Sequence, residues 1–566
     1  MAYFAFAVRF FLLALSFYGY IQYLRKKVLL EFSIGILFSG IGSILFFAGT
    51  LNLLPEAVWG IFLGGLVLTG ISINQKDHVK DILSIGTVFW GILAVFFLFL
   101  LRSSKFIDYD NFSHWALAPK IIAQTNRFPS FQDNCFFFQS YPLGSAAFVY
   151  YFTQVLGLQS EWVQMYAQAV LMAGMLVSLF AFARNPVQAL SVAICGVFLL
   201  CSNIAFTDLS VDSLLPLVAL SATAMCLFYG QALLSKTVFV LPYAVFLTSI
   251  KNSGLFFVIV LYAYLWITLH KGSNKMDWIL LFAAPAGTLL LWTKHVQLVF
   301  INGFNSKHSM SVSNYSAIFK EKTMSDISTV IEHMTENIFT VTNPALWLLL
   351  FGVVLLLVWK RITKLSCQDM KYTVILAVAA YALYQIGMFG MYLFSMRGNE
   401  ALTLASYSRY HKTILIFITG LIVIETLMGA AITKPALHSA FAPIGALFCV
   451  VILSCCALSP NLAFFQKQQL KGTTRYRFDR LIDQYSIPEG ENYLIVTDSG
   501  DGDGYLFFLS CYLLRPQNIV IQPAAGSDNV DLSNMDYIID LDESEKTKAF
   551  LSELSPGHTG PVCQLY

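Results

Sequence analysis

Long apolar runs, separated by short polar stretches, extend along the chain from the first residues to about residue 458. A helix needs about 20 mainly apolar residues to cross the hydrocarbon core of a bilayer. The pattern therefore predicts a polytopic α-helical membrane protein. The first segment, Tyr3 to Ile21, lacks the small-residue cleavage site of a signal peptide, so we expect it to be a retained span.

The same pattern predicts about 14 spans. We expect them at residues 3–21, 29–51, 56–73, 82–101, 163–183, 187–206, 212–234, 238–250, 253–270, 278–300, 343–359, 371–395, 412–431 and 439–458. One further apolar segment, 143–156, would invert every later loop if it crossed the membrane. We expect a short helix docked in the outer leaflet there, since non-spanning backbone is tolerated where protein buries it.

Basic residues predict the orientation, because Lys and Arg accumulate in cytoplasmic loops. Basic stretches follow the first span at 25–27 and recur at 74–80 and 359–364. They alternate with longer polar regions, which we expect on the outer face together with both termini. These outer regions are residues 102–142, 301–341 and 396–411.

The composition changes at about residue 460, where the chain becomes charged and polar. The stretch ENYLIVTDSGDGDGYLFFLSCYLL is typical of a strand, a glycine-rich turn and a helix, and NMDYIIDLD of a second strand. The acids in the turn do not match the spacing of a calcium-binding EF-hand loop. We expect four regions: an N-terminal four-span region in 1–101, an outer loop in 102–142, a helical core in 143–458 and a small extracytoplasmic α/β domain in 459–566.

Of the 566 residues, 57% are hydrophobic and 12% are charged, against about a quarter charged in soluble domains. The net charge of +2 indicates no particular partner, and the lack of a basic tract argues against nucleic-acid binding. The ten cysteines form no CxxC pair. Most lie inside apolar runs, where we expect small core side chains rather than metal or redox sites.

Two aspartates follow the fourth span, in the stretch DYDNFSHW. Asp108 and Asp110 could act as a general base and its orienting partner, or hold a cation or a sugar hydroxyl. They could also be interfacial residues that cap a helix beginning at Asp110 or Asn111. His114 and Trp115 favour a site, because an aromatic ring beside polar groups suits a sugar, although Trp is also common at membrane interfaces.

Other polar residues of the expected outer face are similarly ambiguous. Tyr141, in SYPLG, is either an interfacial residue or a substrate contact. Asp208 and Asp212 lie between two spans, where acids are costly and usually functional, but a helix cap explains them almost as well. Lys251, in TSIKNSGLFF, could meet a phosphate or extend to the lipid headgroups.

The stretch MRGNEALTLASYSRYHK places several basic residues, with Glu400, Arg409 and His411 among its charged and titratable side chains, on the expected outer face. Basic residues there oppose the positive-inside bias. An anionic ligand such as a lipid-linked phosphate would explain them, because the planar guanidinium of Arg makes paired hydrogen bonds to phosphate.

Four motifs occur in order along the chain: DYDNFSHWALAPKIIAQTNRFPSF, YPLGSAAFVYYFTQVLG, LTSIKNSGLFF and LASYSRY. Together they resemble the bacterial branch of the GT-C superfamily of integral membrane glycosyltransferases, over about residues 100 to 412. In the commonest pattern of that family the acidic loop follows the first span, whereas here it follows the fourth.

The resemblance implies an enzyme of the bacterial plasma membrane. It would take a sugar from a polyprenyl-phosphate carrier on the outer face and transfer it, with inversion and without a nucleotide sugar, to a glycan, lipid or protein acceptor. The motif match implies that Asp110 is the catalytic base and Asp108 the second acid. Some relatives with paired acids bind a divalent cation and many do not, so metal dependence stays open.

Residue by residue, the resemblance and the outer-face pattern also predict substrate contacts. Lys251 and Arg409 match positions near the carrier phosphate, and His114 and Lys120 match a motif that orients acceptor or phosphate. The full set of expected substrate-binding residues is His114, Trp115, Lys120, Tyr141, Asp208, Asp212, Lys251, Glu400, Arg409 and His411.

Two other functions fit the same pattern. A transporter or flippase for a lipid-linked glycan would share the spans and the outer basic residues, but the sequence shows no charge pairs within the spans and no paired broken helices. A non-catalytic subunit of a cell-envelope assembly would bind through its C-terminal domain. Substitution of Asp110 by Asn separates these functions, since only an enzyme would lose turnover.

Overall fold

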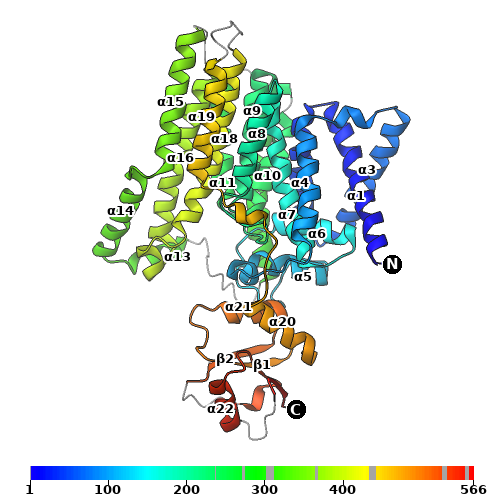
Figure 1. Ribbon diagram of the computed structural model, residues 1–566, viewed down its shortest axis with the longest axis vertical. Helices are drawn as coiled ribbons and strands as arrows, with labels where there is room; N and C mark the ends of the chain where they lie inside the picture. Colours follow the sequence, from blue (N-terminus) through cyan, green and yellow to red (C-terminus); the bar gives the residue numbers. More distant parts are fainter. Residues whose placement is uncertain are drawn as a thin grey trace.

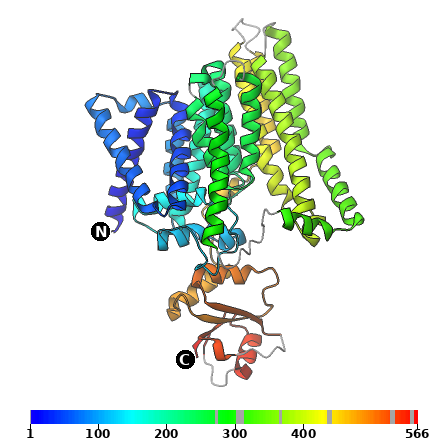
Figure 2. The ribbon, with the colours of Figure 1, turned by 180° about the vertical axis from the view of Figure 1, so that it is seen from behind.

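The computed structural model describes residues 2–235, 237–269, 275–300, 312–363, 368–432, 441–525, 532–554 and 560–565. They form a bundle of helices and a small α/β domain that lies against one end of the bundle (Figure 1). The view from behind shows the same two parts (Figure 2).

Most helices of the bundle follow the predicted apolar runs, and a few lie in the polar regions between them. In chain order they are α1 (Ala2–Arg25), α2 (Leu30–Thr50), α3 (Leu54–Asn74), α4 (Ile85–Leu101), α5 (Leu117–Thr125), α6 (Gly144–Leu156), α7 (Glu161–Leu176), α8 (Pro186–Leu200), α9 (Leu214–Tyr229), α10 (Leu241–Ile250), α11 (Gly254–Leu269), α12 (Lys275–Val299), α13 (Val312–Lys320), α14 (Met324–Phe339), α15 (Pro344–Thr363), α16 (Gln368–Phe394), α17 (Gly398–Leu402), α18 (Tyr407–Ile432) and α19 (Phe441–Leu458). Shorter helical turns are η1 (Val79–Ile82), η2 (Asn111–Trp115), η3 (Val177–Phe182), η4 (Gly230–Ser235) and η5 (Thr237–Phe239).

Eight helices of the described residues are long and apolar enough to cross a membrane, namely α1, α2, α3, α7 with η3, α12, α15, α16 and α18. Shorter apolar helices, α4, α8, α9, α10, α11 and α19, lie at the other predicted positions. The prediction of a helical membrane protein is therefore confirmed. A short helix such as α10 rises only about 15 Å, less than the hydrocarbon thickness, so the count of about 14 full crossings stays a prediction.

Helices α2, α7 and α18 are buried along most of their length, whereas α1, α3, α12 and α15 each expose an apolar face. Exposed leucine, valine and phenylalanine side chains on a helix of this kind are typical of a lipid-facing surface. The central helices therefore form the core of the bundle, and the outer ones cover it.

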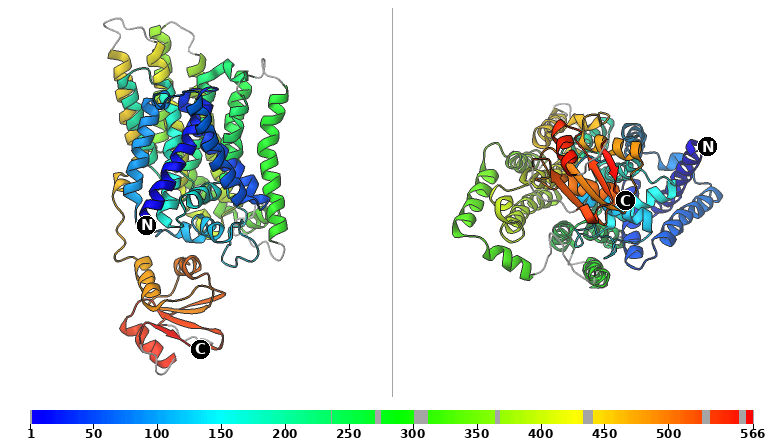
Figure 3. Two further views of the ribbon diagram at one scale, coloured as in Figure 1. Left: turned by 90° about the vertical axis from the view of Figure 1, so that its right-hand side faces the viewer. Right: turned by 90° about the horizontal axis from the view of Figure 1, so that it is seen from below.

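Helix α6 corresponds to the segment expected to dock without crossing. Almost every residue of α6 is buried, and it packs against α2, α5 and α7. At about 20 Å it is short for a span, and it lies at the end of the bundle nearest the C-terminal domain (Figure 1). The N-terminal end of α1 lies at this same end (Figures 1 and 3).

Two of the expected outer loops contain helical structure. Region 301–341 contains α13 and α14, while residues 301–311 lie outside the described part of the chain. Region 396–411 contains α17, and α18 already begins at Tyr407. Arg409 and His411 therefore lie in the first turns of a long helix rather than in a loop.

The C-terminal domain has the expected α/β architecture. It contains α20 (Thr474–Tyr485), β1 (Asn492–Thr497), α21 (Tyr505–Leu514), β2 (Asn518–Pro523), β3 (Tyr537–Asp540), α22 (Glu545–Leu554) and β4 (Val562–Gln564). The sheet order is β2-β1-β3-β4, with β1 parallel to both of its neighbours and β4 antiparallel to β3. The glycine-rich stretch joins β1 to α21, and the Asp501 carboxylate accepts hydrogen bonds from the backbone of Leu506 and Phe507 in the first turn of α21.

Buried contacts hold this domain against the loop that follows α4. Arg475, on α20, is buried and pairs with Glu161 at the start of α7, at 2.7 Å. Its guanidinium also lies over the rings of Phe112 and Tyr512, at 5.8 and 5.5 Å. The Tyr505 hydroxyl donates to the backbone carbonyl of Ile107 at 2.9 Å. The domain is therefore part of the scaffold that positions DYDNFSHW.

Candidate functional site

The stretch DYDNFSHW forms an unusual turn. Residues 111–115 make a single π-helical turn, η2, in which the Ala116 N–H donates to the Asn111 carbonyl at 2.9 Å. All five residues of this turn are buried. Such turns occur often at functional sites, because the extra residue displaces side chains from the helical register. Asp110 immediately precedes the turn, and its side chain makes no capping hydrogen bond, so the helix-cap interpretation of Asp110 is wrong.

Asp110 instead belongs to a row of alternating charges. Its carboxylate forms an ion pair with the Arg409 guanidinium. Arg409 Nε lies 3.3 Å from Asp212 Oδ2, and Lys251 Nζ lies 3.1 Å from Asp212 Oδ1. Four segments contribute: the loop after α4, the chain before α9, the α10–α11 connection and the first turns of α18. The structure thus brings together four of the residues that the sequence singled out.

Asp212 is the central anion of this row. Its side chain is only 5% exposed, and a buried carboxylate is tolerated only when it is paired. Thr413, on α18, donates to the Asp212 carbonyl at 2.9 Å, and Asn203 donates to the Arg409 carbonyl at 3.0 Å. Asp212 is therefore fixed on both its backbone and its side chain. It makes no cap for α9, whose N-cap residue is Ser213.

Lys251 lies inside the protein rather than among lipid headgroups. Burial opposes its charge, but Asp212, Tyr410 and Tyr141 together outweigh this effect and raise the Lys251 pKa, so the ammonium stays protonated. The ammonium also lies over the Trp115 and Tyr410 rings, at 5.7 and 5.6 Å, within cation–π range. A fixed cation at this position could meet an anionic ligand.

A second group of acids surrounds Asp110. Burial, and then the charges of Asp108 and Asp110, raise the pKa of Asp208 to about 7, against hydrogen bonding from Ser210. Partial loss of hydration, and then the Asp110 charge, also raise the pKa of Asp108. The Asn111 side chain accepts a hydrogen bond from the Leu209 N–H at 2.9 Å, which holds this segment against the turn. A carboxylate with a pKa near neutrality can exchange a proton at physiological pH.

Aromatic rings pack beside the charges, where the Lys251 ammonium lies over the Trp115 ring. The Trp115 and Tyr141 rings stack at 5.7 Å, and His114 stacks on Phe138 at 4.2 Å. Burial raises the pKa of Tyr141 to about 12, so its hydroxyl stays protonated. The Ser113 hydroxyl lies 2.8 Å from His114 Nδ1. Flat aromatic surface next to polar groups suits the apolar face of a sugar ring.

Three predicted substrate contacts are not part of the row of charges, although the Glu400 charge still acts on Tyr109 beside Asp110. Lys120 Nζ donates to the Tyr512 carbonyl at 2.5 Å and lies 3.4 Å from Glu489, so it faces the C-terminal domain. Glu400 is exposed on α17. The His411 ring packs between Tyr381 and Tyr407, at 5.9 and 5.6 Å, as core histidines do.

No motif in the sequence indicates the contacts made by the C-terminal domain. Arg475 and Glu161 are 314 residues apart, and neither lies in a recognisable motif. Asp501 and Asp503, in the glycine-rich turn, add to the negative potential around Tyr109. Burial, then the Asp110 charge and then the charges of these two acids raise the pKa of Tyr109 to about 12. Among the described residues, no three His, Cys, Asp or Glu side chains are grouped so that they could hold a metal ion.

No protein-family model matches the chain, and no curated protein matches it. Among solved structures, the chain is similar to ArnT from Cupriavidus metallidurans bound to undecaprenyl phosphate. The match has a TM-score of 0.36 and 12% sequence identity, and it covers 82% of this chain and 87% of that chain. A likeness of this degree bears on neither the family, the substrate nor the reaction of this chain.

Proposed function

We propose that this chain is a membrane glycosyltransferase that transfers a sugar from a polyprenyl-phosphate donor to a cell-envelope acceptor on the outer face of the membrane. The observation that carries the proposal is the row Asp110–Arg409–Asp212–Lys251 at one end of an apolar bundle. A lipid-linked substrate needs a site at the end of the bundle, where the lipid carrier can stay in the bilayer while the sugar extends out of the bilayer.

The reaction needs two kinds of group. The acceptor hydroxyl needs a base, and the phosphate that leaves with the carrier needs cations for its developing charge. Asp110 is the base in this proposal and takes the hydroxyl proton as the acceptor oxygen bonds to the sugar. Arg409 and Lys251 bind the departing phosphate, and Trp115 and Tyr141 provide the surface for the sugar.

The ion pair between Asp110 and Arg409 suggests how the donor activates the base. The Arg409 guanidinium donates to the Asp110 carboxylate, so the oxygen that would accept a proton is already occupied. A phosphate competes well for Arg409, because it accepts paired hydrogen bonds from the planar guanidinium. Donor binding would therefore release Asp110 from its partner and leave it free to accept the acceptor proton.

One observation favours the alternative of a transporter or flippase. Glu425 lies on α18 several turns beyond Arg409, is fully buried, and neither of its carboxylate oxygens has a hydrogen-bond partner among the described residues. Ionisable side chains inside membranes often mark transport pathways. Glu425 is far from the row of charges along the helix, so the two functions can be separated by substitution.

The deciding experiment reconstitutes the purified wild-type protein in proteoliposomes with a panel of polyprenyl-phosphate sugars and envelope acceptors. Release of free carrier phosphate and a sugar-bearing acceptor supports the transferase. Movement of the intact lipid-linked glycan between leaflets, lost in Glu425→Gln, supports the transporter instead. If the protein shows neither sugar transfer nor movement of the glycan, and binds envelope partners through its C-terminal domain, the chain is a non-catalytic subunit.

A further inference from the structure

The C-terminal domain packs along the outer loop in a regular register. Asp133, on the loop, pairs with Arg515 at 3.3 Å. Four residues further along the loop, the Phe137 ring lies 5.9 Å from Phe508 and contacts α21. Cys135 lies midway between these two loop contacts.

Cys511 occupies the matching position on the domain. It lies on α21, three residues after Phe508 and four before Arg515. Residues three and four apart share one face of a helix, so Cys511 lies on the face that contacts the loop. The register that pairs Asp133 with Arg515 and Phe137 with Phe508 therefore brings Cys135 to Cys511.

The two thiols lie close enough to influence each other. The interaction with Cys511, and then the charge of Arg515, lower the pKa of Cys135 against the effect of burial. The interaction with Cys135, and then burial, raise the pKa of Cys511. Thiolate character favours reaction with disulfides, so Cys135 is the more reactive of the pair.

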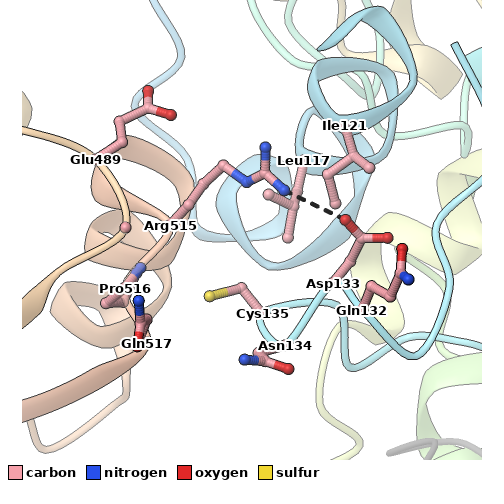
Figure 4. Close-up of a pocket in the computed structure, with 11 residues that line it drawn as sticks. Leu117, Ile121, Gln132, Asp133, Asn134, Cys135, Glu489, Arg515, Pro516 and Gln517 are labelled. Atoms are coloured by element: carbon pink, nitrogen blue, oxygen red, sulfur yellow. Dashed lines mark hydrogen bonds and ion pairs between the residues drawn. The ribbon is translucent and has the colours of Figure 1, made fainter. Parts of the chain in front are cut away.

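Cys135 is also accessible. A cavity of about 380 Å³ lies between the loop and the domain, lined in part by Cys135, Asn134, Arg515 and Gln517. Figure 4 shows the Cys135 sulfur directed towards the C-terminal domain, beside the Asp133–Arg515 ion pair. A reagent of modest size can therefore reach one sulfur of the pair.

We propose that Cys135 and Cys511 form a disulfide that fastens the C-terminal domain to the loop carrying Asp108 and Asp110. The Cys135 thiolate attacks a disulfide-bearing oxidant, forms a mixed disulfide and releases one thiol. Cys511 then attacks the Cys135 sulfur and releases the second thiol, so that two cysteine thiols are oxidised and one disulfide is reduced. Such oxidants act in extracytoplasmic compartments, so the inference rests on the outer location in the proposed function but not on its reaction.

The bond would close a very long segment of chain between the loop and α21. Cross-links of this kind stabilise mainly by restricting the unfolded chain. It would also prevent the domain from separating from the loop. The Arg475–Glu161 pair and the π-helical turn, which are adjacent, would then stay in place.

The test uses the full chain with a specific protease site inserted after Lys471, an exposed residue in the turn before α20. Cells are lysed in a thiol-blocking alkylator, and the membranes are cleaved and run on gels with and without reductant. We expect the two fragments to stay joined without reductant and to separate with it. Separation of wild-type fragments without reductant overturns the proposal.

Variants identify the pair. Cys135→Ser and Cys511→Ser should each give separate fragments in both gels, whereas Cys563→Ser, which changes another cysteine of the same domain, should keep them joined. Persistence of the link in Cys511→Ser would overturn the assignment. Counting alkylated thiols in denatured wild type, before and after reduction, gives a second readout that needs no insertion. The linkage test does not measure activity, so its result is independent of the proposed reaction. A protein that is inactive in proteoliposomes but has linked fragments would contradict the proposed reaction and support the disulfide.

Discussion

Arg409 and Asp110 are 299 residues apart in the sequence and form an ion pair at the end of the helical bundle. Arg409 also faces Asp212, so one guanidinium lies between two carboxylates. Asp110 precedes a π-helical turn and Asp212 precedes α9. Neither local structure by itself brings its acid to Arg409. The pairing is a tertiary feature, and the predictions below test what it does.

Replacing Arg409 should damage turnover strongly. Arg409→Gln removes a cation from the proposed phosphate site, and loss of one such stabilising group typically lowers turnover by about 100-fold or more. Arg409→Lys should retain part of the activity, because it keeps the charge and loses the planar fork. Steady-state release of carrier phosphate measures both.

The matched control is Arg397→Gln. Arg397 is an exposed arginine of the neighbouring segment and pairs only loosely with the exposed Glu321, at 3.6 Å. Its loss should leave turnover unchanged. An Arg409→Gln enzyme that works as well as Arg397→Gln would rule out a role for Arg409 at the phosphate.

Replacing Asp212 should destabilise the fold. Asp212→Asn leaves Lys251 and Arg409 without their shared counter-charge, and breaking a buried pair in this way typically reduces the free energy of unfolding by about 3–5 kcal/mol. The double variant Asp212→Asn with Lys251→Met should recover part of the loss. Thermal unfolding in detergent checks this, and an unchanged midpoint in Asp212→Asn would show that the pair contributes no stability.

Stability should depend on pH through Asp208. Its pKa is raised from 3.8 to about 7 in the folded state, so the folded protein holds a proton that the unfolded chain has released. The resulting stabilisation is present below about pH 4 and is lost as the pH rises through about 7. Between pH 5 and 8, wild type should therefore lose more stability than Asp208→Asn. Unfolding midpoints of both proteins across this range decide the matter, and parallel curves would contradict the assignment.

Lys120 should act in domain docking rather than in chemistry. Its ammonium contacts Tyr512 and Glu489 of the C-terminal domain. Lys120→Met should therefore increase protease cleavage in the segment before α20 while the KM for the donor changes little. A large rise in donor KM without increased cleavage would instead support the role in orienting phosphate that the motif resemblance implies.

The sequence predicted the parts of this protein that depend on local pattern. Apolar runs of helical length gave the bundle helices, and a strand, glycine-rich turn and helix recur as β1 and α21. The charged members of the site were also visible, because basic residues on the expected outer face and acids beside spans both need an explanation.

Local pattern could not decide which partner each side chain takes. A cap was a reasonable expectation for Asp110 and Asp212, but the fold places both carboxylates beside the Arg409 guanidinium instead. The place of Lys120 depends on how the C-terminal domain docks, which no spacing reveals. His411 lies in the core because α18 begins at Tyr407, earlier than the apolar run alone suggests.

The most direct test of the proposed function compares wild type with Asp110→Asn in proteoliposomes, with Asp108→Asn as the neighbouring control. Release of carrier phosphate from a polyprenyl-phosphate sugar in the presence of acceptor is the readout. We expect turnover to vanish in Asp110→Asn, with the protein still inserted and folded, and to persist at a reduced level in Asp108→Asn. Unchanged turnover in Asp110→Asn would contradict the assignment of Asp110 as the catalytic base.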